Sequence, residues 1–356
     1  MTPILSFIFI IFLIVVVHEL GHLLAAKWAG MRADRFQVGF GPPIIRLGRW
    51  NETEFSIGPF PLGGFVAIHG MEPKEYAPEE RAFVDQPLYK RMITIAAGPF
   101  MSIVLALVLF MLVGTVFGLG EFVKPPRIGE VVEGKVADLA GIHEGDRILR
   151  AGVVPVTEWP EVSGVIHNNA GLPVYLMLER AGKTFSVVVF PESDLVPELT
   201  DPLRPTKRSV GRIFCTPQLT RTRVGLVDSV KIAVQHSYMN VQLLFGTLFS
   251  SRVTQDLGGP LAIAGLSGKA AKRGLADLLE LAGQLSLTIG VINLFPIPVL
   301  DGGHLMLYTI EWLRRGKKLS PKMQLGLQYA GLLILLALFV LVTTLDIGRM
   351  IRGETP

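Results

Sequence analysis

The stretch His18-Glu19-Leu20-Gly21-His22 lies inside an apolar run, from Ile4 to Ala26, that holds no Lys or Arg before Lys27. On a helix, two His residues four apart face the same side and can hold one zinc ion, and the Glu between them is placed to act on a water at the metal. Ionisable residues at membrane depth are costly and are therefore functional candidates by default. The pattern predicts a zinc-hydrolase motif inside a transmembrane helix, and hence proteolysis within the membrane.

The composition is typical of a membrane protein with a modest soluble module. Of the 356 residues, 50% are hydrophobic, which exceeds what a soluble domain needs. The net charge is only +4, and the basic residues cluster beside apolar runs. This arrangement indicates membrane topology and gives no stripe for nucleic acid. Cys215 is the only cysteine, which excludes an intrachain disulfide and a thiolate zinc site. Zinc would therefore be held by His and carboxylate groups.

Hydropathy predicts a polytopic α-helical membrane protein with four transmembrane helices, at about 20 residues per crossing. The N-terminus lacks the basic region and cleavage site of a secretory signal peptide, so we expect the first helix to be retained. The predicted parts are a first transmembrane helix with the His-Glu motif (1–30), a membrane-associated β-sheet and loop on the cytoplasmic side (31–92), a second transmembrane helix (93–118), a β-rich domain (125–192), a linker with amphipathic surface helices (193–274), a third transmembrane helix with a broken segment (275–313) and a fourth (323–346).

Two segments outside the helices favour β-structure. Residues 36–69 alternate or are rich in β-formers between Gly, Pro and Asn51, which predicts a small antiparallel sheet at the membrane face near the zinc. The β-rich pattern of residues 125–192 resembles a PDZ domain, a module that binds an extended peptide at a sheet edge. Because the second helix runs outward, we expect this domain on the extracytoplasmic side, with a peptide as a possible ligand.

A third zinc ligand is needed, since catalytic zinc sites usually have three protein ligands. Asp301 is the natural candidate, because it is a carboxylate in the apolar segment Asn293–His304, where two prolines and two glycines forbid a regular helix. Lys27 follows the first helix and predicts that His18 and His22 lie in the cytoplasmic half of the bilayer. Asp301 reaches that half only if residues 224–250 lie on the outer surface. Hydropathy alone also permits these residues to cross.

Two further residues of the broken segment are open to more than one interpretation. His304 is a rival zinc ligand, although a capping or supporting role fits it better. Asn293 is placed to anchor an unwound substrate strand through its side-chain amide, or to satisfy backbone groups freed by Pro296. The sheet at 36–69 could offer an edge to the same unwound strand.

Taken together, these motifs resemble the bacterial site-2 protease family, of the regulator of sigma-E protease type. The resemblance rests on stretches spread over nearly the whole chain. They are His18–His22, Gly39-Phe-Gly-Pro42, Pro61-Leu-Gly-Gly-Phe-Val66, Ala97-Gly-Pro99, the PDZ pattern, Leu257-Gly-Gly-Pro260 and Asn293–His304.

The resemblance implies a zinc metalloendopeptidase of the bacterial inner membrane. His18, His22 and Asp301 would bind Zn2+, Glu19 would be the catalytic acid and base, and Asn293 would contact substrate. The implied substrates are single-span membrane proteins, such as anti-sigma factors in stress-regulated intramembrane proteolysis, and remnant signal peptides. The chain shows one PDZ pattern where some members have two. Ser102 stands where many members carry Asn, which weakens the expectation of a role at this position.

The competing interpretation is not enzymatic. A membrane receptor or scaffold could hold a partner through the PDZ domain and keep an idle His-Glu motif. A transporter could also use a broken helix, but no inverted repeat is visible and the soluble domain would be unexplained.

Overall fold

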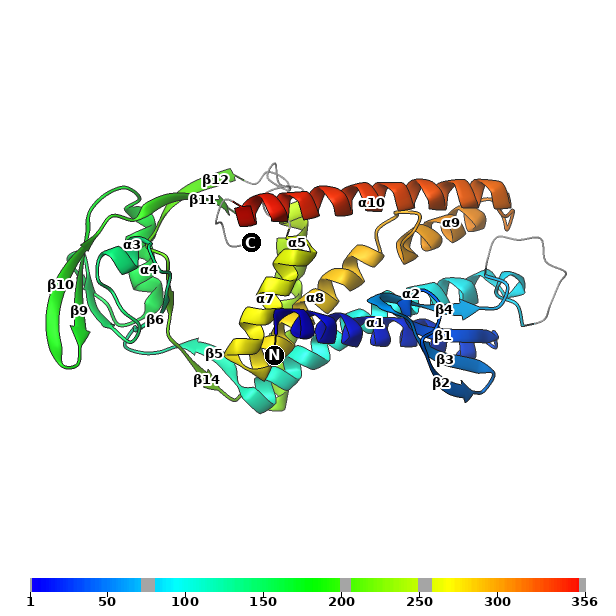
Figure 1. Cartoon of the computed structure of the whole chain (residues 1–356), viewed down its shortest axis with the longest axis horizontal. Helices are drawn as coiled ribbons and strands as arrows, with labels where there is room; N and C mark the ends of the chain where they lie inside the picture. Colours follow the sequence, from blue (N-terminus) through cyan, green and yellow to red (C-terminus); the bar gives the residue numbers. More distant parts are fainter. Residues whose placement is uncertain (1, 72–80, 199–205, 249–257, 352–356) are drawn as a thin grey trace. The chain divides into compact units, whose positions relative to one another are not determined.

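The computed structural model describes residues 2–71, 81–198, 206–248 and 258–351. The chain forms two compact units. We call Met1–Val113 with Val227–Pro356 the membrane unit, and Gly114–Leu226 the β-rich unit. Figure 1 shows their elements, coloured along the sequence.

Four helices of the chain are long and apolar enough to cross a bilayer: Pro3–Trp28, Leu88–Phe117, Leu275–Asn293 and Pro321–Ile351. The prediction of four helices able to span a membrane is thereby confirmed. The helix over 226–248 is not one of these candidates, while residues 249–250 and Leu257 lie outside the described residues. The helices are α1 (Pro3–Trp28), a 3-10 turn η1 (Phe83–Asp85), α2 (Leu88–Leu112), which continues as a π turn η2 (Val113–Phe117), α5 (Leu226–Leu248), α7 (Pro260–Arg273), α8 (Leu275–Asn293), α9 (Asp301–Leu313) and α10 (Pro321–Ile351).

Close helix contacts at glycines organise the membrane unit. A Cβ at Gly283 of α8 would crowd the ring of Phe110 on α2, and one at Gly290 would lie 3.0 Å from the Cβ of Ser102. Helices in a bilayer associate through such close packing, because lipid tails give no hydrophobic drive between them. The small residues therefore set the distance between α2 and α8.

The sheet of the membrane unit lies along α1 (Figure 1) and has the strand order β2-β3-β1-β4. The expectation of a purely antiparallel sheet is wrong, because β1 and β3 pair in parallel, with Phe36 opposite Phe55. The β2–β3 hairpin folds so that β3, with buried Thr53 and Ser56, lies between β2 and β1 inside the sheet. β2 is exposed along its whole length and takes the edge, where its arginines oppose pairing with another strand. The strands are β1 (Ala33–Phe40), β2 (Ile45–Trp50), β3 (Thr53–Ile57) and β4 (Phe60–Ile68).

The β-rich unit has a conventional hydrophobic core, which includes Ile128, Ile148, Leu176 and Leu178. Its largest sheet has the order β10-β9-β7-β8, and β13 pairs with β6 while β14 pairs with β5. Because of these last pairs, the compact unit extends beyond 125–192 at both ends. Its elements are β5 (Leu119–Phe122), β6 (Ile128–Val131), α3 (Val136–Leu139), β7 (Arg147–Ala151), β8 (Val154–Pro155), α4 (Trp159–Asn168), β9 (Val174–Arg180), β10 (Lys183–Val189), β11 (Glu192–Glu198), β12 (Thr206–Arg212), β13 (Cys215–Pro217) and β14 (Leu219–Thr222).

Candidate metal centre

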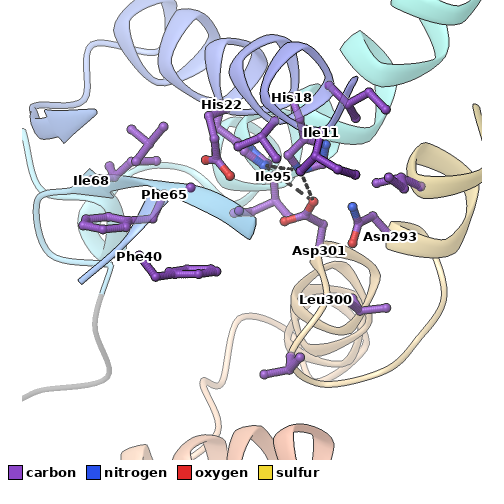
Figure 2. A pocket seen from close by; sticks show the side chains of 18 of the residues that line it. Ile11, His18, His22, Phe40, Phe65, Ile68, Ile95, Asn293, Leu300 and Asp301 are labelled. Atoms are coloured by element: carbon purple, nitrogen blue, oxygen red, sulfur yellow. Dashed lines mark hydrogen bonds and ion pairs between the residues drawn. The ribbon is translucent and has the colours of Figure 1, made fainter. Parts of the chain in front are cut away.

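Three side chains capable of binding a metal converge in the membrane unit (Figure 2). The Nε2 atoms of His18 and His22 lie 3.3 Å apart, and Oδ2 of Asp301 lies 3.1 Å from the first and 3.5 Å from the second. Within the described part of the chain, these residues are the group of His, Cys, Asp or Glu side chains close enough to share one ion. The structure thus brings together the three residues that the sequence singled out as ligands.

The position of His22 depends on two glycines where α1 crosses α2. A Cβ at Gly21 would overlap with the carbonyl group of Ala97, and a Cβ at Gly98 would overlap with the His22 imidazole. Only glycine leaves room for the two helices at this distance. Gly21 in the His-Glu motif and Gly98 in the Ala97-Gly98-Pro99 motif therefore form the same contact between α1 and α2.

The Nδ1 atoms of both histidines contact polar groups of α2. Nδ1 of His22 lies 2.9 Å from the carbonyl oxygen of Thr94. A carbonyl only accepts, so Nδ1 carries the proton and Nε2 keeps a free lone pair for a metal. Nδ1 of His18 lies 2.9 Å from Oγ of Ser102, whose own carbonyl accepts a 2.8 Å bond from Ser286. Such contacts orient metal-binding imidazoles.

Ser102 departs from the family pattern, and the sequence by itself offered little reason to expect a role for it. Its spacing carried a usable signal, since Ser102 follows Gly98 by four residues and so lies on the same face of α2. The Thr94 contact uses a backbone carbonyl and leaves no mark in the sequence.

Asp301 is presented by a tight loop between α8 and α9. The helix α8 ends at Asn293 and α9 begins at Asp301. A Cβ at Gly302 would overlap with the carbonyl of Leu294, and one at Gly303 with the carbonyl of Ile297. The loop therefore folds back over the first turn of α9, and this places the Asp301 carboxylate at a helix N-terminus, where negative charge is favoured.

Glu19 faces the sheet from the same turn of α1 as the histidines. The backbone N–H of Val66 in β4 lies near enough to interact with the Glu19 carboxylate. A Cβ at the neighbouring Gly64 would press on Val15 and on the Glu19 side chain. The edge strand β4 thus lies directly against the turn that carries the His-Glu motif.

A cavity of about 410 Å³ opens beside these residues. Apolar side chains such as Ile14 and Phe65 line most of it, together with His18, Glu19, His22, Asp301 and Asn293. Asn293 ends α8 and shares the cavity with Asp301, as Figure 2 shows. His304 does not belong to the group of ligand atoms and packs its ring 6.4 Å from that of Tyr308.

Comparison with known proteins assigns the chain to a family. The sequence profile described as peptidase family M50 matches residues 6–338. The chain belongs to peptidase family M50. A predicted zinc metalloprotease of Rhizobium meliloti is 34% identical over 90% of this chain and 89% of its own length. The corresponding protein of Agrobacterium fabrum is 33% identical over 98% and 96%. The zinc metalloprotease RasP of Geobacillus kaustophilus is 28% identical over 97% and 98%.

Membership of peptidase family M50, the site-2 protease family, confirms the resemblance found in the sequence. The chain is accordingly a zinc metalloprotease with Zn2+ as its cofactor. The family and the four candidate transmembrane helices together identify a protein of the inner membrane. The scaffold interpretation with an idle motif is not favoured.

The geometry of the three side chains fits zinc. Donors on a tetrahedral zinc ion at about 2.0–2.1 Å lie roughly 3.3 Å from one another. The separations among the two Nε2 atoms and Oδ2 are 3.1, 3.3 and 3.5 Å. All three side chains are largely buried, with 9–18% of each exposed, so few waters compete for the ion.

Proposed function

We propose that this M50 peptidase cuts peptide bonds within or near the transmembrane segment of single-span membrane proteins. The observation that carries the proposal is the meeting of His18 and His22 from α1 with Asp301 from α9, beside Glu19. We assign the two histidines and the aspartate as the zinc ligands. The two histidines lie on a transmembrane helix about nine and five residues before Lys27, or about 13 and 8 Å at 1.5 Å per residue.

Glu19 is the acid and base of the reaction. Zinc at the three ligands supplies Lewis-acid polarisation of the scissile carbonyl and of the attacking water. The Glu19 carboxylate takes the proton from that water and then delivers it to the leaving nitrogen. The strand β4 packs closely against this side chain at Gly64, which limits the motion of the carboxylate between the two proton transfers.

A substrate helix has to unwind before attack, since its carbonyls are bonded along its own axis. The strand β4 is an edge of its sheet and lines the cavity through Gly64 and Phe65. We assign it as the partner of the unwound segment, which would replace the lost hydrogen bonds by strand addition. Asn293 lines the same cavity and contacts the same segment through its amide.

The proposed substrates are anti-sigma factors already trimmed by another protease, and remnant signal peptides. The proposed placement puts the active site in the cytoplasmic half of the bilayer. Lys27 lies in the last turn of α1, and α9 is followed by Arg314, Arg315, Lys317 and Lys318. Both chain segments that carry the proposed ligands therefore end in positive charge, which is typical of the cytoplasmic side.

The β-rich unit is proposed to be an extracytoplasmic PDZ domain that selects these substrates. A cavity of about 270 Å³ lies between Trp159 and Ser163 of α4 and the residues Cys215 and Thr216 of strand β13. A peptide lying along that strand would receive main-chain hydrogen bonds from it and pack side chains against α4. Burial raises the pKa of the Cys215 thiol in this cavity to about 12, so the groove holds no reactive thiolate.

The principal test compares wild type with Glu19→Gln, both purified in detergent. Zinc per chain is measured by atomic absorption, and each protein is incubated with a single-span model substrate that carries a helix-breaking residue. We expect one zinc in both and cleavage by wild type alone. Glu52→Gln, an exposed glutamate paired with Arg81, serves as the control and should cleave normally.

Two results would overturn the assignment. Cleavage by Glu19→Gln at the wild-type rate would remove Glu19 from the chemistry. Full zinc occupancy in Asp301→Ala would remove Asp301 from the ligands.

The PDZ proposal has a separate test. A fluorescent hydrophobic peptide with a free carboxyl end is titrated with the full-length protein, and anisotropy reports binding. Ser163→Trp fills the cavity and is expected to abolish binding, whereas Val153→Trp, at a position that is 85% exposed, leaves it unchanged. Equal binding by both variants would contradict a ligand site in this groove.

A further inference from the structure

A buried ion pair joins α2 to α9 away from the metal centre. Nη1 of Arg91 donates to Oε2 of Glu311 at 3.0 Å, and Nη2 donates to Oε1 at 2.6 Å. The two side chains are only 7% and 8% exposed. Nε of Arg91 also donates to the carbonyl of Gln86 at 3.1 Å, and the guanidinium lies 5.2 Å from the centre of the Tyr308 ring. Each of the three guanidinium nitrogens of Arg91 therefore donates a hydrogen bond, which fixes the side chain in position.

Stability alone does not explain a pair of this kind. Removing two charges from water costs several kcal/mol per ion, so an apolar pair of similar volume is often as stable or more stable. The best attested use of a buried ionic contact is to fix the register of two elements. The bidentate geometry of Arg and carboxylate suits this role because both the distance and the orientation are specified.

The register fixed by this pair is that of the helix that presents Asp301. Glu311 lies ten residues after Asp301 on α9, about 15 Å along the helix axis. On α2, Arg91 is three residues before Thr94, so both lie on one face, and Thr94 accepts the Nδ1 proton of His22. One face of α2 therefore contacts His22 through Thr94. The same face contacts α9, the helix that carries Asp301, through Arg91.

We propose that Arg91 and Glu311 are positioning residues that hold α9 in the register at which Asp301 meets His18 and His22. A slip of one residue would move Asp301 by about 1.5 Å and turn it by about 100°. That is enough to break contacts of 3.1 and 3.5 Å. The inference rests on the proposed function, in which Asp301 is a zinc ligand.

The test separates register from stability. The double variant Arg91→Met with Glu311→Leu replaces the pair by apolar side chains in the full-length protein in detergent. Thermal unfolding, zinc affinity by competition with a chelating dye, and the visible spectrum of the cobalt-substituted protein are recorded. The matched control is Arg81→Met with Glu52→Leu, which removes an exposed pair with a 3.0 Å contact in the same unit.

We expect the unfolding temperature of the double variant to equal or exceed that of wild type, while its zinc affinity falls roughly 10–100-fold. Its cobalt spectrum should lose intensity, and the control should match wild type in all three measurements. Wild-type zinc affinity and an unchanged spectrum in the double variant would overturn the inference.

Two further variants keep the outcome decisive. If the apolar variant does not fold, Arg91→Lys keeps the charge but cannot form both bonds, and it should weaken zinc binding several-fold. Wild-type affinity in a folded Arg91→Lys then overturns the inference. Asp301→Asn distinguishes the two proposals: if it keeps full zinc affinity, the ligand assignment itself fails, whereas if it loses zinc and the double variant does not, only the register role fails.

Discussion

The two units of the chain bury different kinds of residue. The core of the β-rich unit is formed by large aliphatic side chains, and Asp146 is the one buried polar side chain among its described residues. The membrane unit buries His22, Arg91 and Glu311 together with many serines and threonines, while large apolar side chains of α10 are exposed. The difference follows from the solvent, since water drives apolar groups inward whereas lipid does not. In the membrane unit, close packing and polar contacts therefore determine the structure, and the proposed zinc ligand His22 takes part in those contacts.

Gly98→Ala is the most severe test of the claim that close packing determines the structure of the membrane unit. The added Cβ would overlap with the His22 imidazole, so the ring has to leave the position in which its Nε2 faces Asp301. We expect zinc content to fall and cleavage of a single-span substrate to drop at least about 100-fold. Gly326→Ala in α10, where nothing lies within 4 Å of an added Cβ, should retain zinc and activity. Equal activity in the two variants would contradict the packing argument.

Ser102→Ala tests a polar contact in the same unit. Loss of the 2.9 Å contact with Nδ1 of His18 frees the ring to rotate, so we expect zinc affinity to fall about 10-fold, measured by chelator competition. Ser102→Thr retains the hydroxyl group and should recover most of the affinity. The role of Ser102 is disproved if the alanine variant binds zinc as tightly as wild type.

Asp146 provides the corresponding test in the β-rich unit. Burial raises the pKa of this carboxyl, but the two bonds from Arg180 and the bond from the His143 N–H outweigh it, so the pKa is lowered. The carboxylate therefore stabilises the fold above its unfolded pKa of about 3.9, and this contribution is lost as pH falls through the lower folded pKa. We expect Asp146→Asn to lower the free energy of unfolding by about 2 kcal/mol at pH 7.

The measurement uses the fluorescence of Trp159, with Trp28, Trp50 and Trp312 replaced by Phe in both proteins. Urea unfolding is followed at pH 7 and below pH 4. The wild-type advantage should shrink at the lower pH, while the two proteins should bind zinc equally well at pH 7. A constant difference between the two proteins at both pH values would remove the ionic explanation.

Gly164→Ala should have the smallest effect and the opposite sign to Gly98→Ala. Gly164 lies within α4, and an added Cβ would meet nothing within 4 Å. Alanine in a helix interior is favoured over glycine by about 0.5–1 kcal/mol, so the same Trp159 assay should report a slightly more stable β-rich unit. A loss of stability would mean that this glycine, like Gly98, is required by its surroundings.

Local patterns were sufficient for the parts of the fold set by short-range rules. Four spans follow from the hydropathy of the chain, because bilayer thickness dictates helix length. The spacing of His18 and His22 places them together on any helix. Asp301 stood out because Pro296, Pro298 and two glycines break the helix around a carboxylate. The prediction of an antiparallel sheet was wrong in part, since the pattern of residues 36–69 does not specify that β1 and β3 pair in parallel.

What the sequence determined by itself is thus the set of spans, the His-Glu motif and the chemistry of a third ligand, since helix periodicity and hydropathy act over a few residues. Only the tertiary structure decided which groups hold that set in place. His22 is bound by a carbonyl 72 residues away, His18 by a hydroxyl 84 residues away, and Arg91 by a carboxylate 220 residues away. Contacts over such distances depend on how the helices cross, and that depends on small residues whose effect appears only when a neighbouring helix packs against them.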